Sequence, residues 1–267
     1  MGKKIIFSKE QIKEIIKMYN DGISMVKIAE QFNCSNKTIG RLLKKENIKS
    51  RGNRKIFFNE EIFNNIDNAE KAYWIGFITA DGYINEDRGF LSIKLQYDDI
   101  EHLKKFAKFI GCSEENIVTE YHNITGKPLC RICLNSRKLV DSLVNLNIRQ
   151  NKSTDEHVTS IPNEFIRDYI RGIIDGDGHI DKKRIDICNS IEVLTYIKNY
   201  LNEKCYTTIG KICNHCNTYR IFICKNREIA LKFLYYDNCI CLNRKYDFIK
   251  ENYFNNTQKE KIVIIYK

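Results

Sequence analysis

The fold of this chain is decided by a stretch that occurs twice, AYWIGFITADGYI at residues 72–84 and DYIRGIIDGDGHI at residues 168–180. Each copy is an apolar run that ends in Asp-Gly, and each is too short to span a bilayer, so we expect a buried helix. Small residues recur four apart and share one helix face, where they let two backbones approach closely. We predict that the two helices pack against each other. The small residues are Ala72, Gly76 and Ala80 in the first copy and Gly172 and Gly176 in the second.

Each copy ends in an acidic side chain, Asp81 or Asp177, followed by a glycine that we interpret as a helix C-cap. A helix C-terminus carries partial negative charge, so two such ends with two carboxylates repel each other unless a cation lies between them. Oxygen ligands of this kind suit Mg²⁺ better than zinc. In a single copy, Asp-Gly could equally be a plain helix end or a hairpin turn. The recurrence on matched small-faced helices favours the metal site.

The segments WIGFITADG (74–82) and IRGIIDGDG (170–178) resemble the paired motifs of single-chain, two-repeat LAGLIDADG homing endonucleases. The resemblance implies that the last Asp of each motif binds the catalytic metals. The first copy has Thr79 where the second keeps the motif's earlier acid as Asp175. That departure affects the residue less closely tied to the chemistry. The implied metal-site residues are Asp81, Asp177, Ala80 and Gly176.

The resemblance covers about residues 65–255 and implies an α+β fold. By this resemblance we expect two pseudo-symmetric αββαββα repeats that pack through the motif helices, because in that family two curved sheets form a saddle over the DNA groove. Asp67 and Glu70 are the expected cap of the first motif helix. The patterns predict strands at 83–85, 89–96, 116–121 and 129–134 and helices at 99–110 and 136–146 in the first repeat. In the second they predict strands at 180, 184–188, 207–212 and 219–224 and helices at 191–201 and 226–235.

The N-terminal residues predict three short helices. Ser8 and Gln11 form a capping-box signature, residues 26–32 form a second helix, and Ser35 caps a third that runs to about Lys45. The pattern resembles the helix-turn-helix of resolvase-type and related DNA-binding proteins. A three-helix packing module with a solvated basic face is the alternative. The expected DNA contacts are Asn36, Lys37, Thr38, Arg41 and Lys44, with Arg51 and Arg54 of the following basic segment lying along phosphates.

We therefore divide the chain into a helix-turn-helix domain (1–50), a basic linker (51–66), a first repeat (67–155) and a second repeat with a C-terminal tail (156–267). Polar side chains on the sheets are expected to read DNA, although ordinary solvent-facing residues would look the same locally. These sheet residues are Lys94, Arg131, Arg184, Lys211 and Arg220.

Three further residues correspond by resemblance to catalytic positions of the family. Lys152 and Lys245 follow the last helix of each repeat, where the family often has an active-site lysine that could polarise the scissile phosphate or the attacking water. Gln96 corresponds to a polar residue on the second strand. Its counterpart in the second repeat is either Asn189 or Ser190.

Composition limits the function classes. The net charge of +10, from 44 Lys and Arg against 34 Asp and Glu, suggests a polyanionic partner. The 11 cysteines, in a chain without a recognisable secretory signal or membrane span, indicate reduced thiols and an intracellular protein. Zinc binding by Cys130 and Cys133 is disfavoured, because residues three apart in a strand point to opposite faces. Cys213 and Cys216 lie in an expected hairpin that could fold around a metal more easily, but a structural zinc site needs four converging ligands.

We predict a monomeric, site-specific homing endonuclease that hydrolyses one phosphodiester on each strand of double-stranded DNA, with Mg²⁺ or, as a substitute, Mn²⁺. Two other roles remain open on the same scaffold, an RNA maturase that acts on intron RNA and a DNA-binding regulator. A regulator is expected to have lost one motif Asp, and both are present here.

Overall fold

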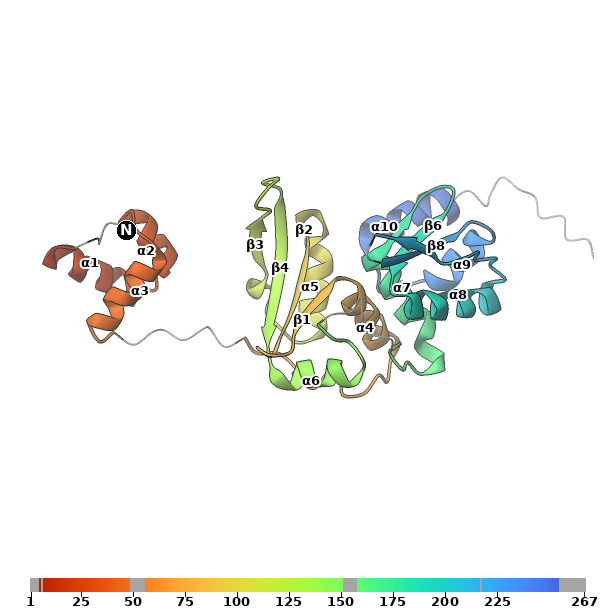
Figure 1. Cartoon of the computed structure of the whole chain (residues 1–267), viewed down its shortest axis with the longest axis horizontal. Helices are drawn as coiled ribbons and strands as arrows, with labels where there is room; N and C mark the ends of the chain where they lie inside the picture. The colour runs from red at the N-terminus through yellow and green to blue at the C-terminus, as the bar shows by residue number, and fades with distance from the viewer. Residues whose placement is uncertain (1–4, 6, 49–55, 151–157, 217, 255–267) are drawn as a thin grey trace, which may run out of the picture. The chain divides into compact units, whose positions relative to one another are not determined.

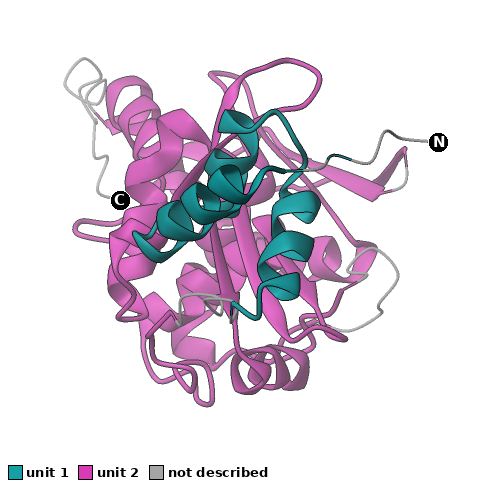
Figure 2. Cartoon of the chain, turned by 90° about the vertical axis from the view of Figure 1, so that its left-hand side faces the viewer, with its two compact units in different colours: residues 1–55 teal, residues 56–267 magenta. Residues whose placement is uncertain are grey.

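The computed structural model divides the chain into two compact units, residues 1–55 and residues 56–267 (Figure 2). Within the described part of the chain, no helix is both long enough and apolar enough to cross a membrane. The structure describes residues 5, 7–48, 56–150, 158–216 and 218–254.

The first unit contains three helices, α1 (Lys9–Asn20), α2 (Met25–Gln31) and α3 (Asn36–Lys45). A serine precedes each helix and accepts a hydrogen bond from its first turn, and Ser8 forms the predicted capping box with Gln11. The apolar side chains face inward and form a separate small core. Its buried residues are Ile15, Tyr19, Ile28, Ala29, Ile39 and Leu43.

The second unit contains the two predicted repeats, each with the order αββαββα and an antiparallel four-stranded sheet (Figure 1). The first sheet has the order β1-β2-β4-β3 and the second has the equivalent order β5-β6-β8-β7. The first repeat consists of α4 (Ala69–Asp81), β1 (Gly82–Asn85), β2 (Phe90–Gln96), α5 (Ile100–Phe109), β3 (Val118–Tyr121), β4 (Pro128–Asn135) and α6 (Arg137–Asn145). The second consists of α7 (Ile166–Asp177), β5 (Gly178–Ile180), β6 (Ile185–Asn189), α8 (Ile191–Cys205), β7 (Cys213–His215), β8 (Thr218–Ile223) and α9 (Arg227–Leu234).

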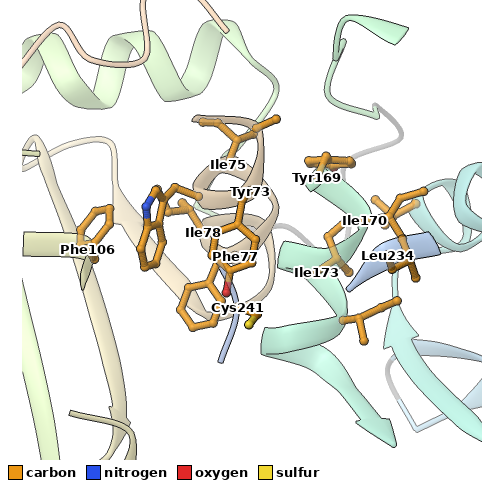
Figure 3. Packing of buried hydrophobic residues seen from close by; sticks show 14 of the residues in the cluster. Tyr73, Ile75, Phe77, Ile78, Phe106, Tyr169, Ile170, Ile173, Leu234 and Cys241 are labelled. Carbon is orange, nitrogen blue, oxygen red and sulfur yellow. The ribbon is translucent and has the colours of Figure 1, made fainter. Parts of the chain in front are cut away.

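Helices α4 and α7 pack directly against each other at the centre of the second unit (Figure 3). Their backbones meet at two glycines. A Cβ added at Gly76 would lie 2.9 Å from the carbonyl carbon of Tyr169, and one added at Gly172 would lie 2.7 Å from the amide nitrogen of Phe77. The predicted close approach is therefore present, and only glycine permits it at these two positions.

The core is continuous across this helix pair. Helices α5 and α6 cover one face of the first sheet, and α8 packs against β6 and β8 of the second sheet. Buried side chains of both repeats belong to one cluster that includes Trp74, Phe106, Ile173 and Leu234. The two motif helices are thereby held between the two sheets (Figure 1).

Three local predictions were wrong. Residues 207–212 do not form a strand, and β7 begins at Cys213. The left-handed backbone of Tyr206 turns the chain there, and the Asn202 side chain accepts a hydrogen bond from the Ile209 amide that a sheet would otherwise use.

The other two concern the ends of elements. The first motif helix is capped by Asn68, whose side chain accepts from the Lys71 amide, while Asp67 instead pairs with the Lys71 ammonium at 2.9 Å. A further helix, α10 (Asn243–Ile249), was not predicted. It is followed by a π-helical turn, Lys250–Phe254, and contains Lys245.

Candidate active site

Asp81 and Asp177 are the last residues of α4 and α7, and both are half-buried. A Cβ added at Gly176, the residue before Asp177, would lie 3.4 Å from both Cγ and Oδ2 of Asp81. The Asp81 carboxylate therefore lies beside the C-terminal end of α7. Ala80 also lies beside the end of α7, because its Cβ is the atom nearest to a Cβ added at Gly176. The packing of the two helices thus brings together the four residues expected at the metal site.

Lys245 lies beneath this point and is 6% exposed. Its Nζ donates to the carbonyl oxygens of Ile174 (2.5 Å) and Asp175 (2.7 Å) near the end of α7 and of Gly178 (2.5 Å), the residue that caps the helix. Burial lowers the pKa of Lys245 to about 8, while the charge of Asp175, and more weakly those of Asp81 and Asp177, opposes that decrease. The ammonium is thus still protonated at neutral pH and offsets the negative end of the helix.

This geometry differs from the role expected for Lys245, which would direct the ammonium toward a phosphate. The three ammonium hydrogens are directed to backbone carbonyls, so the side chain supports the end of α7 from inside. Lys152, its predicted counterpart in the first repeat, lies outside the described residues.

The sequence left Asn189 and Ser190 as alternative counterparts of Gln96 in the second repeat, and the structure places Asn189 next to Asp177. Its Nδ2 donates to Asp177 Oδ2 at 2.7 Å and fixes the rotamer of that carboxylate. Gln96 is exposed at the end of β2. The strand registers pair Gly82 with Ile93 and Gly178 with Ile187, so Gln96 is equivalent to Ser190 by position. The contact to the motif acid nevertheless comes from Asn189.

Asp175, the motif's earlier acid, is completely enclosed and holds the two repeats together. It accepts hydrogen bonds from the Tyr73 hydroxyl of α4 (2.8 Å), from the Tyr235 hydroxyl (2.7 Å) and from the Leu242 amide (2.7 Å). Burial raises its pKa, although these donors and Lys245 lower it. The sequence showed only that an acid stands here in one copy, because its partners are distant in the chain.

His102 extends this network, with its Nε2 2.9 Å from the Tyr73 hydroxyl. Burial lowers the pKa of His102 to about 3 from an ordinary value of 6.5, and the nearby Lys105 charge adds to the decrease. The unfolded chain therefore binds a proton between about pH 6.5 and about pH 3 that the folded chain does not.

We expect the protein to lose stability as the pH falls below about 6.5, by up to about 1.4 kcal/mol per pH unit from this group alone. Replacement by glutamine, His102→Gln, should remove that dependence. Urea unfolding at about pH 7 and about pH 5 measures it. His179→Gln is the matched control, because that side chain is 72% exposed. Equal acid sensitivity in wild type and His102→Gln would contradict the assignment.

The predicted DNA-facing residues of the sheets occur in ion pairs. Lys94 of β2 and Arg131 of β4 both contact Glu120 of β3, at 3.1 and 2.6 Å. In the second repeat, Arg220 Nε lies 3.1 Å from Asp186, while Arg184 is exposed. Lys211 is exposed in the loop before β7. Glu120 was not identified from the sequence.

The cysteines are free thiols, and all 11 lie in described segments. Cys130 is buried and Cys133 half-buried on the opposite face of β4, as expected. Across the residues that the structure describes, no group of three or more His, Cys, Asp and Glu side chains is arranged to hold a metal ion.

In the first unit, α3 presents its polar face to solvent. Asn36, Lys37, Arg41 and Lys44 are exposed, and Thr38 is half-buried with its hydroxyl 2.9 Å from that of Ser35. Arg51 and Arg54 lie outside the described residues. The basic helix α3 thus packs on α1 and α2 with its polar face exposed. The recognition helix of a helix-turn-helix, which enters the major groove, is held in the same way.

Residues 2–46 match the family model of the helix-turn-helix domain of resolvase. The helix-turn-helix predicted from the serine caps and the basic third helix is thus confirmed. Among curated proteins, no sequence matches this chain.

Solved structures similar to this chain include homing endonucleases. I-DmoI in complex with DNA and Ca is 15% identical, with a TM-score of 0.47, over 72% of this chain and 99% of that chain. I-WcaI bound to its DNA recognition sequence is 14% identical, with a TM-score of 0.47, over 76% and 97%. Full-length DUF199/WhiA from Thermatoga maritima is 17% identical, with a TM-score of 0.45, over 77% and 75%. These solved structures include homing endonucleases, the family that the two Asp-Gly stretches resemble, while the function proposed below rests on the residues of this chain.

The donors at the ends of α4 and α7 fit a hard divalent cation. They are carboxylate oxygens, with backbone carbonyls of the same turns close by, and none of them is a thiolate or imidazole. Two carboxylates satisfy only part of an octahedral shell, and Mg²⁺ commonly keeps waters or takes phosphate oxygens for the remainder. The residues present therefore suit Mg²⁺ in contact with a phosphate-bearing substrate.

Proposed function

We propose that this protein is a site-specific DNA endonuclease that hydrolyses one phosphodiester on each strand of a duplex. The single observation that carries the proposal is the convergence of Asp81 and Asp177 at the abutting ends of α4 and α7. Two carboxylates at two negative helix ends are unfavourable by themselves. The Lys245 ammonium offsets part of this charge at the end of α7, and a divalent cation would compensate the remainder.

Each repeat contributes one half of the candidate site, which matches a substrate with two strands. Each repeat supplies one terminal Asp and one four-stranded sheet, in the same order and with the same register between its first two strands. A duplex has two antiparallel strands with equivalent phosphates, so a pseudo-symmetric pair of sites suits one cut in each. The net charge of +10 supports a polyanionic substrate.

The residues of this chain have separate roles in the proposed mechanism. Asp81 and Asp177 would hold Mg²⁺, with Mn²⁺ as a substitute, and such an ion supplies water activation and stabilisation of the leaving oxygen. Asn189 orients the Asp177 carboxylate through its hydrogen bond. Lys245 occupies the carbonyls that end α7 and keeps that turn from unwinding under the repulsion of the two acids.

Cleavage of a randomised duplex library with Mg²⁺, followed by sequencing of the ends, tests the proposal. Staggered ends enriched around one long site are the expected result. Tight, salt-sensitive DNA binding without any cutting would contradict the endonuclease. It would favour the regulator or maturase, and intron RNA would be the next ligand to test.

The helix-turn-helix is proposed to add affinity as a second DNA-binding module on the same chain. Deleting residues 1–50 should weaken binding to the target by roughly 100-fold, because a tethered module binds at a high effective concentration. Metal-dependent cleavage should persist at higher protein concentration. Equilibrium binding and cleavage assays on the truncated protein measure both effects.

Point variants provide the matched control for that deletion. Arg41→Ala on the exposed face of α3 should reproduce part of the loss, whereas Lys17→Ala on α1 should not. If the truncated protein bound and discriminated its targets as well as the full chain, the helix-turn-helix would have no role in DNA recognition.

A further inference from the structure

The open face of the first sheet carries an arginine that is held by an acid. Arg131 lies in β4 directly opposite Lys94 in β2, and Glu120 of the edge strand β3 contacts both. Glu120 Oε1 accepts from Arg131 Nε at 2.7 Å and lies 2.6 Å from Nη2. Burial raises the pKa of Glu120, but the Lys94 hydrogen bond and the Arg131 charge outweigh it and lower the pKa overall, so Glu120 is ionised.

The second sheet has an arginine at the equivalent position, with partly different partners. The residue after Ile93 is Lys94, which pairs with Arg131, and the residue after Ile187 is Cys188, which pairs with Arg220. Ile93 pairs with Gly82, and Ile187 pairs with Gly178, and these glycines directly follow the motif acids. Arg131 and Arg220 therefore lie at equivalent positions relative to the candidate active site. Arg220 Nε donates to the Cys188 sulfur at 3.2 Å and also lies 3.1 Å from Asp186 Oδ1, and its Nη2 lies 3.1 Å from His215 Nε2. Asp186 belongs to β6, whereas Glu120 belongs to the edge strand β3.

An acid placed on the Nε side of a guanidinium leaves its outer edge available. A guanidinium is planar with five donors, so the Glu120 carboxylate at Nε and Nη2 of Arg131 leaves Nη1 and the second Nη2 hydrogen available. In Arg220 the contacts at Nε and Nη2 leave the Nη1 hydrogens available. That edge matches the O6 and N7 acceptors of guanine in the major groove. The Arg131 and Arg220 side chains are 32% and 29% exposed, so they are accessible from the open faces.

We propose that Arg131 and Arg220 each read one guanine, in equivalent positions of the two halves of the target, and that Glu120 and Asp186 are positioning residues that fix the two guanidinium groups. The inference rests on the proposed function, because it names part of the target that the same protein cuts. It also gives a specificity role to Glu120 and Asp186. Both acids lie on the sheet faces that are proposed to contact DNA, where a carboxylate would otherwise weaken DNA binding by repelling phosphates.

A purely local explanation exists for Glu120. Lys94 and Arg131 are like charges directly opposite each other, which is unfavourable in a sheet, and an acid between them relieves the repulsion. If that were its whole role, its loss would change stability and overall affinity but not the choice of base. The readout must therefore be base preference, measured apart from affinity.

The experiment is selection of bound duplexes from a randomised library by the full chain in EDTA, with sequencing of the bound fraction. It needs no cleavage and no metal. The variants are Arg131→Lys, Arg220→Lys, Glu120→Gln and Asp186→Asn. Lysine keeps the positive charge but cannot donate the two parallel hydrogen bonds of a guanidinium. Glu101→Gln is the control, because Glu101 also pairs with a lysine, Lys104 at 2.7 Å, but on helix α5. Circular dichroism confirms that each variant is folded.

Wild type should enrich a G·C pair at one position in each half-site. Arg131→Lys should reduce that preference in one half only, by roughly 5-fold to 150-fold, with non-specific affinity nearly unchanged. Arg220→Lys should do the same in the other half. Glu120→Gln and Asp186→Asn should each reduce the preference of their own half while raising affinity for unrelated DNA, because each removes a negative charge from the surface.

The outcomes separate the two proposals. If the arginine variants weaken binding to every sequence equally, the arginines contact phosphates and the inference is wrong while the endonuclease stands. If Glu120→Gln and Asp186→Asn leave base preference at the wild-type value, the acids have no positioning role. If wild type binds duplex DNA no better than a neutral protein of this size, the proposed function fails, and the inference fails with it.

Discussion

Replacing Asp177 by asparagine is expected to abolish cleavage of both strands while DNA binding stays close to that of wild type. The change keeps the shape of the side chain but removes its charge from the point where α4 and α7 end. Without it Asp81 alone would be left to hold the proposed cation, and the transition state would lose much of its electrostatic stabilisation. Removal of one preorganised electrostatic contact costs about 100-fold to 1,000-fold in rate, and we expect a loss of at least this size. Single-turnover cleavage of the selected target, beside equilibrium binding, measures both quantities.

Asp81→Asn should behave in the same way, since the two acids are equivalent in the two repeats. Asp87→Asn is the matched control, because it is the same substitution at an exposed position in the turn between β1 and β2. Retained cutting in both Asp81→Asn and Asp177→Asn would exclude this pair as the catalytic site.

Replacing Gly172 by alanine should have the largest effect on stability. The added methyl group would lie 2.7 Å from the Phe77 amide nitrogen and closer still to the Tyr73 carbonyl oxygen, both of them backbone atoms of α4. Backbone cannot move aside as a side chain can, so the helices must separate along a core that is buried throughout. We expect the free energy of unfolding to fall by at least about 3 kcal/mol. Urea unfolding followed by circular dichroism measures it.

The same variant links the fold to the proposed function. Separating α4 from α7 also separates Asp81 from Asp177, so any protein that still folds should cut far more slowly than wild type. Gly210→Ala is the control within the same unit, because a Cβ there meets no atom within 4 Å. A change of less than about 0.5 kcal/mol in Gly172→Ala would mean that the two backbones do not touch at this point.

Local sequence patterns were sufficient for the order of the elements. Apolar periodicity and serine caps placed the helices to within a few residues, because those features act through neighbours three and four positions away. The strand predicted at 207–212 failed because a left-handed residue, Tyr206, and a side chain from α8, Asn202, decide the path there. Neither signal is visible in the alternation of residues on which strand prediction depends.

The sequence by itself determined that two Asp-ended helices with glycine faces exist, because repetition and four-residue spacing are properties of the chain alone. Only the tertiary structure decided what surrounds them. It directed Lys245 to the carbonyls of α7, enclosed Asp175 among donors from α4 and from the chain after α9, and paired Glu120 and Asp186 with the arginines of the sheets. These contacts join residues 11 to 102 positions apart. They depend on which strands and helices become neighbours, and the energy of such a contact is not encoded in either partner's local sequence.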